Sequence, residues 1–149
     1  MRYLQGTLVL PLLATFALAC SDSPVDPNPN PNPGPSNGGS QPIADPSFSL
    51  VIQPIFQNSG CTASNCHGVA QSGGLDLRSG SAFGSLVNAP AQGESGKVRV
   101  IPGNATDSYL VVKLEGRQTF GTNMPVGGSL NQVDLTNIRN WINQGAKNN

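Results

Sequence analysis

Charged and aromatic side chains are both scarce in this chain of 149 residues. Charged residues make up 11% of the sequence and aromatic residues 5%, and the formal net charge is zero. Nucleic-acid-binding proteins usually carry a clustered excess of basic residues, so the balanced charge predicts no nucleic-acid partner. The shortage of aromatic residues leaves a small domain with little core material. A cofactor or a covalent cross-link is therefore expected as a further source of stability.

The first twenty residues are typical of an export signal. Arg2 gives a positive start, and Leu8 to Ala19 is an uncharged apolar run. The run is shorter than the about 20 residues that a membrane span needs. It ends in Ala17-Leu18-Ala19-Cys20, which resembles a lipobox. We therefore expect residues 1–19 to be a lipoprotein signal peptide and Cys20 to carry the lipid that anchors the protein to a membrane. Cleavage without lipidation is the alternative.

Proline and glycine are abundant, with 13 and 18 residues, and much of the proline lies in the next segment. Eight of residues 21–46 are proline, and their alternation with asparagine favours extended polyproline II. We expect residues 20–46 to be the lipidated cysteine and a disordered linker that holds a domain at residues 47–149 away from the membrane. The expected location is the cell envelope, facing the periplasm or on the outer membrane, which Ser21 favours by resemblance to enteric lipoproteins.

The most informative stretch is residues 60–68, Gly-Cys-Thr-Ala-Ser-Asn-Cys-His-Gly. Two cysteines with a histidine directly after the second form the arrangement that attaches haem c. Each thiol adds to one vinyl group of the porphyrin, and the adjacent imidazole binds the iron. Two residues usually separate the cysteines, whereas here there are four. The segment between Cys61 and Cys66 must therefore bulge if both sulfurs are to reach the vinyl groups.

Two other interpretations of this motif stay open. Cys61 and Cys66 would pair as a disulfide in an oxidising compartment, since lipidation of Cys20 leaves an even number of cysteines. A zinc site would need a fourth ligand, and no further cysteine or histidine remains to provide one. His67 favours haem because it is the only histidine of the chain.

Met124 lies in a predicted loop, Gly121-Thr122-Asn123-Met124-Pro125, and is the only methionine left after processing. A lone methionine most often fills a gap in a core, but polar neighbours and glycine-rich turns are unusual surroundings for that role. A thioether sulfur is a suitable sixth ligand for haem iron and raises its reduction potential. The pattern therefore favours Met124 as an iron ligand together with His67.

Three helices are predicted around these motifs, within residues 48–58, 106–114 and 131–145. Apolar spacing defines the first and the last, and the second follows a turn at residues 102–104. The candidate N-caps are Asp45 or Ser47 for the first helix, Thr106 or Asp107 for the second, and Asn131, in an approximate capping box with Asp134, for the third.

Taken in order, these pieces resemble small c-type cytochrome domains, in particular those of exported lipoproteins and planctomycete-type cytochromes. The resemblance spans about residues 48–146. It rests on the order of these sequence pieces: IQPIF, CHG, LDL, PG followed by SYL, MP followed by GG and L, and WI followed by QGA. It implies an all-α fold, a small cytochrome c-like helical domain with long irregular loops whose first and last helices cross near the haem edge. It also implies thioether bonds at Cys61 and Cys66, with His67 as the proximal and Met124 as the distal ligand. Residues 75–91 would form a turn and a short helix over one haem face.

The resulting hypothesis is a single-haem c-type cytochrome lipoprotein that exchanges single electrons with redox partner proteins in the cell envelope. Iron held by His67 and Met124 has no open site for a substrate, and no other histidine remains for acid–base work, so we expect no enzyme activity. Two alternatives stay open. One is a non-haem binding or adaptor lipoprotein with a Cys61–Cys66 disulfide. The other is a catalytic haem protein, such as a peroxidase, in which Met124 dissociates.

Overall fold

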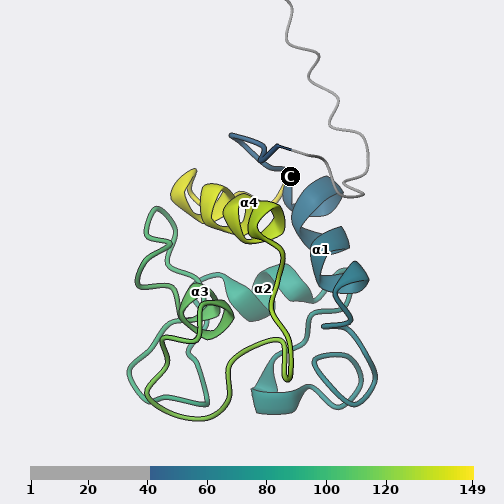
Figure 1. Ribbon diagram of the computed structural model, residues 1–149, viewed down its shortest axis with the longest axis vertical. Helices are drawn as coiled ribbons and strands as arrows, with labels where there is room; N and C mark the ends of the chain where they lie inside the picture. Colours follow the sequence, from purple (N-terminus) through teal and green to yellow (C-terminus); the bar gives the residue numbers. More distant parts are fainter. Residues whose placement is uncertain (1–40) are drawn as a thin grey trace, which may run out of the picture. The chain divides into compact units, whose positions relative to one another are not determined.

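A computed structural model describes residues 41–149 of the chain (Figure 1). The expected signal peptide, the lipidation site Cys20 and most of the predicted linker lie outside the described residues. Within residues 41–149 the regular secondary structure is helical, and β pairing is limited to three isolated bridges. The predicted helical class is thereby confirmed. None of the helices in this part of the chain is both long and apolar enough to span a membrane.

The helices are short and separated by long loops, as the glycine and proline content predicts. In chain order they are the π-helical turn η1 (Phe48–Ile52), α1 (Gln53–Asn58), the 3₁₀ turn η2 (Ser72–Gly74), α2 (Ala82–Leu86), α3 (Tyr109–Leu114) and α4 (Gln132–Asn143). Both η1 and α3 pack against α4. The contact between η1 and α4, the first and last elements, brings the two ends of the described chain together (Figure 1).

The first predicted helix is present, with Ser47 as its N-cap. The Ser47 hydroxyl accepts a hydrogen bond from the Leu50 amide at 3.3 Å. Pro54 follows where the π-helical turn passes into α1, a place near a helix start where its missing N–H costs little. Asp45, the other candidate cap, pairs instead with Lys147 at 3.2 Å.

The C-terminal helix α4 begins as the capping-box pattern predicts. The Asn131 side chain accepts from the Asp134 amide at 2.9 Å and donates to the Asp134 carboxylate at 2.6 Å. Gly145, just beyond the end of the helix, has a φ of 98°, a conformation that glycine adopts without strain.

The predicted N-cap of α3 is wrong, because the helix begins later than expected. Its N-cap is Ser108, not Thr106 or Asp107. The Asn104 side chain holds Asp107 in the preceding turn. Its NH₂ group donates to the Asp107 carboxylate at 2.7 Å, and its carbonyl oxygen accepts from the Asp107 backbone N–H at 3.1 Å. The Ser108 hydroxyl meanwhile accepts from the Ile101 amide at 2.9 Å.

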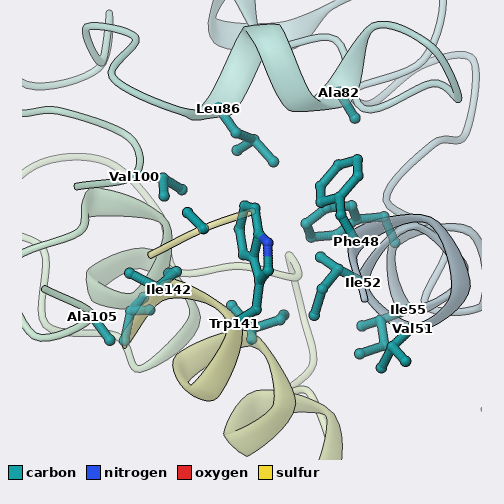
Figure 2. Close-up of a cluster of buried hydrophobic side chains, with 14 of the residues drawn as sticks. Phe48, Val51, Ile52, Ile55, Ala82, Leu86, Val100, Ala105, Trp141 and Ile142 are labelled. Atoms are coloured by element: carbon teal, nitrogen blue, oxygen red, sulfur yellow. The ribbon is translucent and has the colours of Figure 1, made fainter. Parts of the chain in front are cut away.

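The core is centred on Trp141 of α4 (Figure 2). Its indole ring lies 5.2 Å from the ring of Phe48, centroid to centroid, and it is almost completely buried. Leu86 of α2 and Ile52 of η1 close around the same ring (Figure 2). The indole N–H donates to the Lys147 carbonyl at 2.9 Å, so its one polar group is satisfied. One residue therefore joins α4, η1 and α2 into a single packed unit.

Ordered packing begins before residue 47, inside the segment whose composition is that of a linker. The Ile43 amide donates to the Asn137 side chain and the Ile43 carbonyl accepts from the Asn140 side chain, each at 2.7 Å. Pro46 is buried. Ile43 is therefore bonded to α4, and ordered structure extends further toward the N-terminus than the change in composition indicates.

Candidate functional site

A cavity of about 500 Å³ lies beside the core and brings together the four candidate ligand residues. Cys61, Cys66, His67 and Met124 all line it, although Met124 lies in a different loop from the other three. Cavities of roughly 300–1,000 Å³ are typical of small-molecule and cofactor sites. The sequence thus identified residues that share one site.

The wall of this cavity is mainly apolar. Four leucines that line it are only half-buried although they pack against the core: Leu75, Leu110, Leu114 and Leu130. Fully buried residues of α1, α2 and α4, such as Ile55, Leu86 and Ile138, complete the wall. Removing apolar surface from water stabilises by about 25 cal/mol per Å², so this wall favours an apolar occupant.

The four residues between the cysteines form a backbone loop closed on itself. The His67 amide donates to the Cys61 carbonyl at 3.1 Å, which ties the two ends of the motif together. Inside the loop the Ala63 carbonyl accepts from the amides of Cys66 and Gly68 at 2.9 and 3.1 Å. The wider spacing is therefore taken up within the loop, and both cysteines still line the cavity.

Gly68 makes this closure possible. A Cβ atom at this position would lie 2.3 Å from the Thr62 carbonyl oxygen and 2.8 Å from the Ala63 carbonyl oxygen. Both neighbours are backbone atoms inside the hydrogen-bonded loop, so they have little room to move. Sequence reasoning missed this role, although the glycine directly after the histidine was the available signal.

Both cysteines are free thiols in this structure. Burial raises the pKa of the Cys61 thiol, a backbone hydrogen bond opposes part of this effect, and a negative charge on Cys66 would add to the rise. The protonated thiol is therefore the favoured form of Cys61 at neutral pH. Among residues 41–149, no three His, Cys, Asp or Glu side chains gather into a possible metal site.

The His67 ring is oriented by a backbone carbonyl. Its Nδ1 lies 2.9 Å from the Ser72 carbonyl oxygen. A carbonyl only accepts, so Nδ1 carries the proton and, in the neutral ring, Nε2 carries the lone pair. Burial lowers the pKa of His67, and the charge of Arg99 adds to this, while the Ser72 carbonyl opposes it. The neutral imidazole, which is the form that binds a metal, is thereby favoured.

Arg99 places a buried positive charge in the cavity wall. The residue is 8% exposed, and its guanidinium donates to the Ser85 and Gly73 carbonyls at 2.8 and 2.9 Å. Within the described residues it forms no salt bridge. Two of its five N–H groups are thus used, and three remain for an acceptor in the cavity. A buried guanidinium of this kind favours an anionic partner.

Tyr109, which also lines the cavity, carries a polar group without a hydrogen-bond partner in the described chain. Its hydroxyl is buried and, among the described residues, makes no hydrogen bond. Burial raises the pKa of Tyr109, and the nearby carboxylate of Glu94, whose buried Oε2 is also without a partner in the described chain, raises it further. The hydroxyl therefore stays protonated, ready to donate to an acceptor in the cavity.

Met124 is half-buried in the loop between α3 and α4 and precedes a cis peptide bond to Pro125. Its amide donates to the Lys113 carbonyl at 2.9 Å. The thioether of Met124 is thus a soft donor on the same cavity as the imidazole of His67.

Comparison of the chain with protein-family models, curated proteins and solved structures finds no match.

Proposed function

We propose that this protein is a single-haem c-type cytochrome lipoprotein that passes single electrons between redox partner proteins in the cell envelope. The observation that supports it most strongly is the shared cavity. Both thiols of the domain, its only histidine and its only methionine line one space of about 500 Å³. These residue types are rare in the chain, so their convergence is a specific signal.

The residues of the cavity fit haem c in four respects. The apolar wall suits a flat macrocycle, and the two free thiols suit its two vinyl groups. The neutral imidazole of His67 and the thioether of Met124 would suit the iron as its nitrogen and sulfur ligands. The unpaired donors of Arg99 and Tyr109 suit the carboxylates of the propionate side chains.

Haem iron held at this cavity by His67 and Met124 would supply one-electron chemistry between a donor and an acceptor. With His67 and Met124 both binding the iron, no position would be open for a substrate. Electron transfer without catalysis is therefore the function that these residues support best.

We further propose, from the sequence, that Cys20 is lipidated and anchors the domain to a membrane of the cell envelope. A single set of variants tests both proposals. The chain is produced in the periplasm of a host that attaches haem c, as wild type and with Cys66→Ser, His67→Ala or Cys20→Ser. Cys20→Ser is the matched control, because it also removes one thiol.

Wild type should gain the mass of one porphyrin and show the sharp alpha band of haem c after reduction in pyridine. Cys66→Ser and His67→Ala should lose stable haem. Cys20→Ser should keep the haem but move from the detergent phase to the aqueous phase on partitioning. A wild-type chain with a Cys61–Cys66 disulfide and no porphyrin mass would overturn the haem proposal and favour an adaptor lipoprotein.

A potentiometric titration then tests the reaction. A one-electron couple changes its oxidised-to-reduced ratio tenfold for each 59 mV. We expect that slope together with only weak binding of exogenous ligands such as imidazole, which must displace Met124, to the oxidised protein. Ready binding of small ligands by the wild type would favour a catalytic haem protein instead.

A further inference from the structure

The loop that carries Met124 is hydrogen-bonded to the rest of the described chain at one residue, Lys113. Within residues 118–128 the hydrogen bonds are few, and those that leave the loop within the described chain both go to Lys113. The Met124 amide donates to the Lys113 carbonyl at 2.9 Å, and the Lys113 ammonium donates to the Thr122 carbonyl. The loop is otherwise largely open to solvent, with Phe120 72% exposed and Val126 70% exposed.

The place of Lys113 in α3 explains why it can make both contacts. It lies in the last turn of the helix, where carbonyl groups lack a partner inside the helix and are free to accept from another segment. Its half-buried stem lines the cavity, and its ammonium carries three donors. The ammonium also lies 5.9 Å from the centre of the Tyr109 ring, which restricts its position further.

The two contacts fix the backbone on the N-terminal side of Met124 and thereby the direction of its side chain. One holds the carbonyl of Thr122 and the other the amide of Met124, two residues further along. Gly121 lies beside the same lysine, since a Cβ atom there would be in ordinary van der Waals contact with the Lys113 ammonium, at 3.4 Å. Gly121 and Gly127 have φ values of 74° and 75°, and such glycine turns give the loop no stiffness of their own.

We propose that Lys113 is the positioning residue that holds Met124 at the cavity. This inference rests on the proposed function, in which Met124 is an axial ligand of haem iron. Lys113 itself does not touch the iron in this proposal. It acts by limiting the loop positions in which the thioether leaves the site.

The experiment uses the haem-loaded protein with Lys113→Met, Lys113→Gln and Lys113→Arg. Met124→Ala serves as the reference for a lost ligand, and Lys97→Met is the matched control, because Lys97 is 49% exposed and does not line the cavity. Three quantities are measured: the long-wavelength sulfur-to-iron band of the oxidised protein, the affinity for exogenous imidazole, and hydrogen exchange of the Met124 amide.

We expect Lys113→Met to keep its haem but to weaken the sulfur-to-iron band and bind imidazole about tenfold more tightly, the factor that one lost hydrogen bond provides. Exchange of the Met124 amide should become faster. Lys113→Gln should lie between Lys113→Met and wild type because its amide donor has a shorter reach. Lys113→Arg and Lys97→Met should behave like wild type.

Failure of this inference is distinct from failure of the haem proposal. If wild type holds haem and shows the sulfur-to-iron band, an unchanged imidazole affinity in Lys113→Met would overturn the role of Lys113. Loss of the fold in both Lys113→Met and Lys113→Gln would do the same, because it would assign the lysine a structural role. If wild type holds no haem, amide exchange still decides whether Lys113 holds the loop.

Discussion

The two segments that bring candidate iron ligands to the cavity are held in very different ways. In residues 60–77, the amide of His67 donates to Cys61, its carbonyl accepts from Leu77 and its ring donates to Ser72. Within residues 41–149, Met124 is hydrogen-bonded only through its amide, to the Lys113 carbonyl. The difference indicates a rigid side, built to keep its ligand in place, and a side whose ligand is held at one point.

A basic side chain from another segment stabilises each side through backbone carbonyls. Arg99 donates to the Gly73 carbonyl, directly after the residue that orients His67, and Lys113 donates to the Thr122 carbonyl, two residues before Met124. Arg99 is buried, and the loop that it contacts also has several backbone hydrogen bonds of its own. Lys113 is half-buried, and within the described chain it makes all the hydrogen bonds that link the Met124 loop to other segments. Changes on the first side should therefore affect the fold, and changes on the second should affect mainly the ligand.

The largest effect is expected from Gly68→Ala, which breaks the rigid side. The added Cβ would lie 2.3 Å from a backbone oxygen of the same loop, so the loop must open. Overpacking of this kind costs about 1–3 kcal/mol, and opening separates the two thiols from the cavity. We expect a lower free energy of unfolding, measured with urea, and little covalent haem, measured by intact mass.

Gly84→Ala is the matched control for this prediction. Gly84 lies inside α2, has an ordinary φ, and a Cβ there would meet no atom within 4 Å. The same substitution should raise the free energy of unfolding by up to about 1 kcal/mol through helix propensity. Equal behaviour of the two variants would show that the loop of residues 61–68 is not tightly closed.

A smaller effect is expected from acid, and only on the His67 side. The Arg78 guanidinium and the Arg78 amide hold the pKa of Asp76 far below its ordinary value of 3.8. A carboxyl group with a lowered folded pKa adds stability above pH 3.8 that is lost progressively as the pH falls below that value. Residues 118–128 contain no acidic, basic or histidine side chain, so the other side has no such response.

Asp76→Asn tests this difference. The variant should be less stable than wild type at pH 7, and its free energy of unfolding should change less than that of wild type between pH 5 and pH 2 (about the range in which carboxyl groups titrate). Asp107→Asn removes a carboxylate from the turn before α3 and serves as the control. If the free energy of unfolding of wild type and of Asp76→Asn fell in the same way between pH 5 and pH 2, the Asp76–Arg78 ion pair would not stabilise this segment.

The sequence predicts the site residues better than the contacts that hold them. Cys61, Cys66, His67 and Met124 stand out because their side-chain types are rare and chemically specific. The first and last helices follow from Ser47 and the Asn131 capping box, whose signals are local in sequence.

The anchoring contacts have no comparable signal. Arg99 and Lys113 bind backbone carbonyls, which every residue has, so nothing at Gly73, Ser85 or Thr122 marks the contact in advance. The start of α3 was mispredicted for a related reason. Several side chains in the turn before it are able to cap a helix, and only the folded turn decides which of them are already in use.

The smallest effect is expected from Phe120→Ser in the Met124 loop. The side chain is 72% exposed and bonds to nothing that positions the loop, so the free energy of unfolding should change by less than about 0.5 kcal/mol. Val69→Ser is the counterpart on the His67 side, 71% exposed, with the same expectation. Urea unfolding and the sulfur-to-iron band measure both variants. If Phe120→Ser weakened the band while Val69→Ser did not, the Met124 loop would be held by apolar packing as well as by Lys113. The two segments would then differ less in how firmly they hold their ligands, because packing of the exposed Phe120 would be a second contact that holds the Met124 loop.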